Sequence, residues 1–329
     1  MMKKWHTYTP LATGFKRYRC CVQYKGTTYS GWQITGDAHI PSIQECLANA
    51  FDRFIGEGNH INLKGSSRTD KGVHALKNVF QIDLMRRKRH TGELHDIDLD
   101  INNIKEGLNY YLYPETNIKI TEVSLVDETF DSRRNALSRT YIYRIITQHS
   151  NHNTTMFHND TAWILKPGII LDRDLMQNAA NLLIGEHDFS TFRNSGCQSV
   201  SAMRFVSQLD INQLMISSIP TSLSSSATFT TASLPISLAS HPFLPQPLSI
   251  SPQSSTNLLL DGANITTITI TANSFLLKMV RNIVGLLVEV GQKKISIQEF
   301  ERLFHSKDRT LLKAQAPAQG LYLQNVQYD

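Results

Sequence analysis

Residues 65–78, GSSRTDKGVHALKN, place an arginine and an aspartate two positions apart among small and polar residues. A carboxylate can serve as a covalent nucleophile without activation by a base. Burial alone raises the pKa of a carboxyl group, whereas a guanidinium within salt-bridge reach lowers it. Two interpretations of Arg68 and Asp70 therefore stand on the residues alone: an ion pair on the surface of a loop, or a nucleophile with a cation beside it.

The sequence lacks the spacings of other common catalytic sites. Its 12 histidines are scattered, and none falls in an HExxH or Cys/His ligand spacing, so we expect no bound metal. A P-loop, a Rossmann glycine fingerprint and a GxSxG elbow are also absent, and we expect no cofactor. The cysteines Cys20, Cys21, Cys46 and Cys197 show no CxxC pairing, which favours a reducing compartment over a disulfide framework.

Composition bounds the remaining possibilities. A chain of 329 residues predicts two domains, and 41% hydrophobic residues fit a globular protein. Lys and Arg number 33 against 28 Asp and Glu, and this positive excess favours an anionic partner. The N-terminus, MMKKWHTYTP, lacks the apolar core of a signal peptide, and no uncharged apolar run reaches the roughly 18 residues of a membrane span. We therefore expect a cytoplasmic protein without a membrane segment.

Hydrophobic periodicity divides the first half of the chain into six elements. Strands are predicted by alternation and helices by an apolar stripe, and the first helix opens with Ser42 and Glu45 in capping-box spacing. The predicted elements are strand 17–24, helix 41–55, strand 61–66, strand 79–84, helix 100–112 and strand 117–123. This order is the split βαβ arrangement of ferredoxin-like folds.

The second half repeats this pattern. The predicted elements are strand 139–147, helix 172–185, strands 204–212 and 265–272, helix 274–291, helix 296–304 and strand 320–328. We therefore predict an α+β fold with a tail at 1–14, an N-terminal ferredoxin-like domain at 15–135 and a C-terminal one at 136–329. Two such sheets side by side leave a groove between them.

One segment interrupts the second half. Residues 211–260 contain no Asp, Glu, Lys or Arg, are dominated by Ser and Thr, and hold six of the chain's 11 prolines. Such a composition, without sustained periodicity, is typical of an irregular insertion. We predict a spacer in the hairpin between two strands, with no catalytic role.

Seven short motifs occur in an order that resembles one family. SRTDKGVHA is similar to the GRTDxGVHA signature of the TruA family of tRNA pseudouridine synthases. The other six motifs, which resemble that family's motifs in its order from about residue 15 to 326, are YKGTTYSGWQ, PSIQECL, SRTYIYRI, GEHDFSTFR, MVRNIVG and GLYL. The segment 211–260 lies outside the resemblance.

The resemblance implies an enzyme and a substrate. The family converts uridine to pseudouridine in the tRNA anticodon stem-loop, at tRNA positions 38, 39 and 40, and uses no cofactor. Its members act as homodimers that jointly hold a tRNA. Their fold joins two ferredoxin-like halves into one continuous, mostly antiparallel sheet, with helices on one side and a basic RNA-binding cleft.

The resemblance also assigns roles to single residues. Asp70 matches the aspartate nucleophile, Tyr141 the tyrosine that packs on the base and serves in proton transfer, and Arg281 the arginine that pairs with the aspartate. Arg68 matches the arginine that helps to extrude the target nucleotide, and Leu323 an apolar residue near the base. Extrusion is required because a base in a stem is unreachable until it is flipped.

Two positions depart from the family's signature. Ser67 replaces a glycine, and a positive φ there would strain a serine. Lys71 replaces a small residue directly after the aspartate. A cation at this position strengthens phosphate contacts or lowers the Asp70 pKa further.

A basic run follows the strand after the catalytic loop. Arg86, Arg87, Lys88 and Arg89 are interpreted as contacts for the tRNA backbone, with a solvated surface as the alternative. Two functional alternatives also stay open: a non-catalytic RNA-binding protein on the same scaffold, and a pseudouridine synthase with a different RNA target. The intact catalytic residues favour an enzyme over the first of these.

Overall fold

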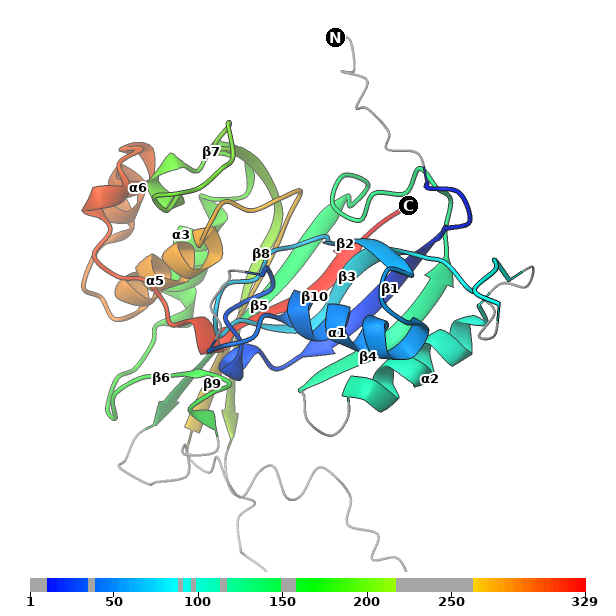
Figure 1. The fold of residues 1–329 in the computed structure, drawn as a ribbon. Helices are drawn as coiled ribbons and strands as arrows, with labels where there is room; N and C mark the ends of the chain where they lie inside the picture. Colours follow the sequence, from blue (N-terminus) through cyan, green and yellow to red (C-terminus); the bar gives the residue numbers. More distant parts are fainter. Residues whose placement is uncertain are drawn as a thin grey trace, which may run out of the picture.

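The computed structural model describes residues 11–34, 39–87, 91–95, 99–112, 117–148, 158–216 and 263–329. Within these ranges the chain forms one ten-stranded sheet with five α-helices, so the predicted α+β class is confirmed (Figure 1). None of these helices is long and apolar enough to cross a membrane.

The sheet runs in the order β4-β1-β3-β10-β5-β9-β8-β7, with β2 paired to β3 and β6 to β5. Its strands are β1 (Lys16–Tyr24), β2 (His60–Gly65), β3 (His74–Leu84), β4 (Ile118–Leu125), β5 (Ser138–Gln148), β6 (Trp163–Ile164), β7 (Gly185–Asp188), β8 (Met203–Ile216), β9 (Ala263–Ala272) and β10 (Leu321–Gln327). All neighbours are antiparallel except β10 with β3 and β6 with β5. The sheet is therefore mostly antiparallel, as predicted.

The same lateral order occurs twice in the sheet. The strands β1 to β4 lie in the order β4-β1-β3-β2, and β5, β8, β9 and β10 lie in the order β10-β5-β9-β8. In each set, the strand that comes first in the sequence lies in the sheet between the strands that come fourth and third. The two sets meet where β10 runs parallel to β3, with Tyr322 opposite His74 and Leu323 opposite Ala75. This seam brings the start of β3, directly after the Asp70 loop, close to β5.

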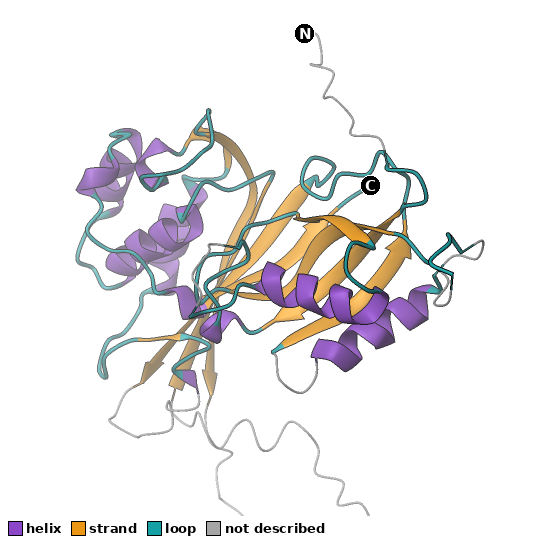
Figure 2. Cartoon of the chain, viewed as in Figure 1, coloured by secondary structure: helices purple, strands orange, loops and turns teal. Residues whose placement is uncertain are grey.

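The helices begin at caps that the sequence supplies. They are α1 (Ile43–Ile55), α2 (Ile101–Leu112), α3 (Arg173–Asn181), α5 (Met279–Gly291) and α6 (Ile297–His305). The predicted capping box of α1 is confirmed, because Ser42 Oγ accepts the Glu45 N–H at 3.1 Å and Glu45 Oε2 accepts the Ser42 N–H at 3.3 Å. At α6, Ser296 Oγ accepts the Glu299 N–H, but the Glu299 carboxylate binds Arg302. Figure 2 shows α1 and α2 together on the first set of strands and the other helices beside the second.

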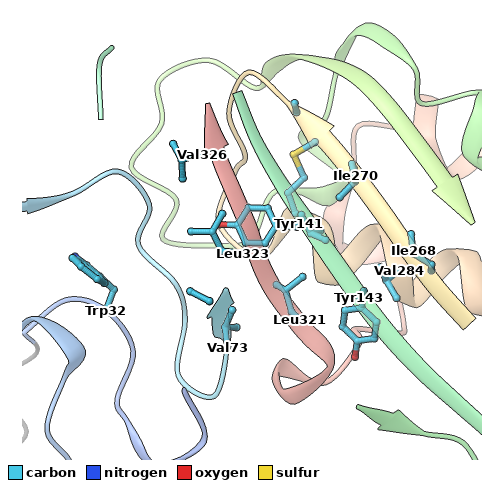
Figure 3. Packing of buried hydrophobic residues seen from close by; sticks show 14 of the residues in the cluster. Trp32, Val73, Tyr141, Tyr143, Ile268, Ile270, Val284, Leu321, Leu323 and Val326 are labelled. Atoms are coloured by element: carbon cyan, nitrogen blue, oxygen red, sulfur yellow. The ribbon is translucent and has the colours of Figure 1, made fainter. Parts of the chain in front are cut away.

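One hydrophobic cluster runs through both sets of strands. In the ladder, Tyr141 on β5 lies between Leu323 on β10 and Ile270 on β9 (Figure 3). Trp32 and Val73, which flank the Asp70 loop in the first set, belong to the same cluster. The two sets therefore share a continuous core.

The hairpin of β8 and β9 carries the Ser/Thr/Pro-rich segment. The two strands stay paired up to Ile216 opposite Ala263, and the structure does not describe residues 217–262 between them. Residues 211–216, which we assigned to the insertion, instead continue β8, because Ile211 is buried opposite Ile268. The segment thus joins two paired strands and begins later than predicted.

Candidate active site

A cavity of about 820 Å³ is lined by residues from both halves of the chain. Five residues that the sequence singled out meet in its walls: Arg68, Asp70, Lys71, Tyr141 and Arg281. They come from the loop between β2 and β3, from β5 and from α5, which are far apart in the sequence. The fold therefore gathers most of the predicted site residues at one place.

The charges of the lining side chains are almost all positive. Among the described residues, Asp70 is the one lining carboxylate, and seven lining residues are cationic. The cations are Arg68, Lys71, Arg133, Arg139, Arg204, Lys278 and Arg281. Such a cavity attracts a polyanion and holds a single carboxylate within it.

A segment next to α1 holds the Asp70 loop in place. The Trp32 N–H donates to Thr69 O at 2.9 Å, and Gly31 forms an isolated antiparallel bridge with Asp70. Gly31 has a φ of 121°, and a Cβ there would lie 2.8 Å from Thr69 O, so this position requires glycine. The Gly31 carbonyl accepts the Ile43 N–H at the start of α1 at 3.0 Å. The loop is therefore anchored to a helix.

Arg281 lies opposite Asp70 in the cavity. Its Nη1 is 3.7 Å from Asp70 Oδ2, and its Nε donates to Ala316 O at 2.8 Å. Burial raises the pKa of Asp70, and the charges of Arg281 and Lys278 offset only part of this rise. Arg281 thus lowers the Asp70 pKa, as expected, but desolvation raises this pKa by more. The second cation that lowers the Asp70 pKa is Lys278, whereas Lys71, which we expected there, is exposed.

Lys278 reaches the cavity because α5 begins late. We predicted a helix over 274–291, but α5 begins at Met279, and Lys278 precedes it with a left-handed φ of 58°. Residues 274–278 line the cavity. The apolar residues of this stretch match a helical stripe, so the sequence carried no signal for the turn.

Tyr141 reaches the cavity from β5. Its side chain is 8% exposed, and its ring meets Phe275 edge-on with 5.1 Å between centroids. Burial raises the pKa of Tyr141 to about 12, although the Ser67 side chain lowers it in part, so the phenol is protonated at neutral pH. Leu323 is fully buried opposite Tyr141, and Leu321 is the leucine of β10 that lines the cavity.

Arg68 is exposed and contacts a loop of the second half of the chain. Its Nη1 donates to Gln198 Oε1 at 3.1 Å, and within the described residues the ion-pair partner of Asp70 is Arg281. The interpretation of Arg68 and Asp70 as a surface ion pair is therefore wrong. Ser67 does not adopt a positive φ, so the replacement of glycine adds no backbone strain there.

The described part of the predicted basic run does not line the cavity. Arg86 and Arg87 are exposed directly after β3, whereas Lys88 and Arg89 fall outside the ranges that the structure describes. Arg87 Nη1 donates to Gly92 O at 2.9 Å. This guanidinium therefore helps to close the turn after β3 as well as facing solvent.

The histidines and carboxylates of the described residues form no group of three or more that could hold a metal ion. His74, close to Asp70 in sequence, is 2% exposed and uses both ring nitrogens. Its Nδ1 accepts the Gly26 N–H at 3.1 Å, and its Nε2 donates to Gln319 O at 3.0 Å. Burial lowers its pKa, so the ring is a neutral packing group that stacks on Tyr322.

Comparison with known proteins identifies the family. A family model described as tRNA pseudouridine synthase matches residues 179–329, which include Arg281 and Leu323. The tRNA pseudouridine synthase A of Xanthobacter autotrophicus is 32% identical over 312 residues, which cover 95% of this chain and 99% of that protein. The protein of the same name from Maricaulis maris is 30% identical over 312 residues, which cover 95% and 98%. The chain belongs to the tRNA pseudouridine synthase family.

In this member of the tRNA pseudouridine synthase family, a buried arginine that the sequence analysis missed joins the cavity walls. Arg139 is 8% exposed and donates to the carbonyls of Arg133 at 2.7 Å, Asn273 at 2.9 Å and Ala136 at 3.1 Å. No carboxylate pairs with it in the described part of the chain, and burial lowers its pKa. Its position two residues before Tyr141 was the available signal, because a buried arginine on a strand requires partners.

Proposed function

We propose that this chain isomerises uridine to pseudouridine in the anticodon stem-loop of tRNA, at positions 38, 39 and 40, with Asp70 as the nucleophile. The observation that carries the proposal is the cavity in which seven cations surround the one lining carboxylate of the described residues. The carboxylate suits covalent attack, and the cations suit a phosphate backbone. The relatives named tRNA pseudouridine synthase A, 30% and 32% identical over 95% of this chain, support the substrate and the reaction class.

The proposed reaction conserves every atom of the substrate. The bond between uracil N1 and ribose C1′ breaks, a bond between C5 and C1′ forms, C5 loses its proton and N1 gains one. Substrate and product are isomers, so the reaction consumes no oxidant, reductant or group donor. The Asp70 carboxylate must be ionised for each route open to it: attack at C6, attack at C1′, or assistance to a glycal intermediate. Arg281 and Lys278 favour this ionised form against desolvation.

Four residues around Asp70 have roles in the proposal. Tyr141 packs on the extruded base and moves a proton, which its protonated phenol permits at neutral pH. Arg281 stabilises the carboxylate. Arg68 fills the position that the extruded nucleotide leaves in the stem. Leu323 acts indirectly, because it packs beside Tyr141 and holds the ring in place.

Contacts to the RNA backbone are proposed at two places. Lys71 lines the cavity, whereas Arg86 and Arg87 do not, and Lys88 and Arg89 follow them in the sequence. Lysine and arginine side chains that neutralise phosphates release counterions, so such contacts make binding strong at low salt and weaker as salt rises.

We further propose that each set of strands with its helices is a ferredoxin-like half, divided near residue 135, and that two chains act together as a cytoplasmic homodimer. The repeated lateral order of fourth, first, third and second strand supports the ferredoxin-like assignment. The homodimer rests on the family resemblance. Sedimentation equilibrium of the purified protein, with and without tRNA, tests it.

The Asp70→Asn variant tests the central assignment, because it keeps the shape of the side chain and removes its charge and nucleophilicity. We expect tritium release from an anticodon stem-loop labelled at uridine C5 to fall below detection, while tRNA binding is retained. Asp127→Asn, at a carboxyl outside the cavity lining, is the matched control and should keep full activity. Substantial release by Asp70→Asn, with host enzymes excluded, would refute the nucleophile.

A further inference from the structure

A buried hydrogen-bond network lies beneath the loop that carries Arg68 and Asp70. Its side chains, each at most 6% exposed, are Tyr24 on β1, Asn78 on β3, and Ser66 and Thr69 in the loop. Leaving one buried polar group without a partner is costly, so a satisfied network holds its members in a single arrangement.

Asn78 is the centre of this network, because it uses all four hydrogen-bonding positions of its amide. Nδ2 donates to Ser67 O at 3.2 Å and to Tyr24 Oη at 3.3 Å. Oδ1 accepts from Ser66 Oγ at 3.0 Å and from the Val79 N–H at 2.9 Å. Turning the amide over would place Nδ2 against the Val79 N–H and Oδ1 against the Ser67 carbonyl. The orientation of Asn78 is therefore fixed.

Tyr24 extends the network to Thr69. The Tyr24 hydroxyl accepts from Asn78 and shares a hydrogen bond of 2.7 Å with Thr69 Oγ1, in which either hydroxyl can donate. Burial raises the pKa of Tyr24, and the phenol keeps its proton. The Thr69 carbonyl also accepts the Trp32 N–H at 2.9 Å. Thr69 is thus held by both its side chain and its backbone.

The anchored residues flank Arg68 and Asp70 within the loop that lines the cavity. Residues 66, 67 and 69 are bound by the network, which thereby fixes the backbone on both sides of Arg68 and directly before Asp70. The side chain of Ser67, whose backbone carbonyl is bound by Asn78, lowers the pKa of Tyr141 on β5. The network therefore relates the Asp70 loop to β5 as well as to β1 and β3.

We propose that Asn78 and Tyr24 are positioning residues that set where the Asp70 carboxylate stands relative to the target base. Among the described residues no hydrogen bond holds this carboxylate, since the approach of Arg281 is 3.7 Å. Its position consequently depends on the backbone of the loop, which the network fixes. A misplacement of about 1 Å costs about 100-fold in rate. The inference rests on the proposed function, in which Asp70 reacts.

Three substitutions each remove one or two hydrogen bonds of the network. Tyr24→Phe and Thr69→Val remove the two ends of one hydrogen bond, and Asn78→Asp replaces the donor that binds Ser67 O by an acceptor. Single-turnover tritium release at saturating tRNA should slow by about 10- to 100-fold in each, with the Kd for tRNA within about 2-fold of the parent. The Tyr24→Phe/Thr69→Val double variant should be no slower than Tyr24→Phe, because Tyr24→Phe already removes the bond that Thr69→Val removes, together with the bond to Asn78.

Two matched controls lose similar bonds away from the cavity. Thr191→Val removes a buried hydroxyl that donates to the carbonyls of Leu303 and Phe304, and Asn109→Asp alters an amide bound to the backbone of Ile120. Both should lower Tm and keep the parental rate. The network variants should combine a comparable loss of Tm with a slower reaction.

A Tyr24→Phe protein that loses Tm but reacts as fast as the controls would overturn the proposal, and so would a loss confined to the Kd for tRNA. If Asn78→Asp fails to fold, the gentler Tyr24→Phe and Thr69→Val variants decide the question. Asp70→Asn, assayed in parallel, separates the two levels of inference. Activity in Asp70→Asn refutes the proposed function, whereas an inactive Asp70→Asn beside fast network variants refutes the positioning role alone.

Discussion

The Arg281 guanidinium and the Asp70 carboxylate stand 3.7 Å apart, too far for a hydrogen bond. Arg281 is fixed on its own wall of the cavity, because its Nε donates to Ala316 O at 2.8 Å. At this separation the guanidinium lowers the Asp70 pKa by less than burial raises it. The proposed nucleophile is therefore an anion that its surroundings stabilise only in part and whose oxygens remain accessible to a substrate.

The raised pKa of Asp70 gives the proposed reaction a pH dependence. The ionised form must react, and its pKa lies above the ordinary value of 3.8, so the rate should rise with pH through the raised pKa and then level off. Arg281→Met removes a charge that lowers this pKa, so it should move the inflection to higher pH. It should also slow the reaction at neutral pH by about 100-fold. Single-turnover tritium release across a range of pH measures both effects.

Arg302→Met is the matched control for Arg281→Met, since Arg302 pairs with Glu299 on the exposed side of α6 and does not line the cavity. It should leave the pH profile unchanged. An Arg281→Met profile with the parental inflection and only a lower plateau would show that Arg281 acts on the substrate instead of on Asp70.

Replacing Lys278 has two effects that can be measured separately, one on backbone strain and one on the charge near Asp70. The Lys278 φ of 58° is left-handed, so Lys278→Gly should raise the free energy of unfolding by about 0.5–1 kcal/mol. The same change removes a charge that lowers the Asp70 pKa, so turnover at neutral pH should fall and the inflection should move to higher pH. Urea unfolding and the pH–rate profile measure the two effects.

Two variants control for Lys278→Gly. Lys293→Gly changes a lysine with the same φ of 58° that does not line the cavity, and it should keep the parental pH profile. Lys278→Arg keeps the charge and should keep most of the rate. Parental turnover in Lys278→Gly would mean that this charge has no bearing on Asp70.

The α+β class and the order of the elements could be predicted because they depend on residues close in sequence. The capping box of Ser42 and Glu45 is local, and α1 begins directly after Ser42, as predicted. The helix predicted over 274–291 is wrong in its first turn, because residues 274–278 form part of the cavity wall. Helical periodicity cannot distinguish apolar residues in such a wall from an apolar stripe that faces the core.

The site could be predicted only in part. The sequence motifs identified Asp70 and Arg281. The distance between these two side chains, and the opposing effects of burial and charge on the Asp70 pKa, depend on the folded chain. The position of Lys278 at the cavity depends on a backbone turn that no residue type in the sequence predicted. Asn78 did offer a signal, since an amide among the apolar residues of a buried strand requires partners.

The basic run after β3 can be tested through the salt dependence of binding. Changing Arg86, Arg87, Lys88 and Arg89 to alanine should weaken tRNA binding and flatten the plot of log Kd against log salt, because fewer counterions are released. The rate on bound tRNA should not change. An unaltered slope would assign the run to a solvated surface, in keeping with the contact of Arg87 to Gly92 O.

Residues 217–262 can be tested as a spacer. Ile216 and Ala263 stand opposite each other at the end of the β8–β9 ladder, so an Asn-Gly turn can replace the segment without breaking a strand pair. Tm and tritium release should stay close to those of the parent, because β8 and β9 remain paired without the segment and the seven family motifs lie outside it. A folded deletion protein that no longer modifies tRNA would show that the segment takes part in substrate binding.

Arg68 is the residue at which stem and loop targets should differ. A paired uridine must be unstacked before it reaches Asp70, and the proposed role of Arg68 is to fill the position it leaves. We expect Arg68→Ala to slow the reaction on a paired uridine about 10-fold more than on an unpaired one. The measurement compares two anticodon stem-loops that differ only in whether the base opposite the target can pair. Gln198→Ala, which removes the partner of the Arg68 guanidinium and keeps the arginine, should leave the ratio of the two rates unchanged. An equal loss on both RNAs would assign Arg68 to backbone binding instead of nucleotide extrusion.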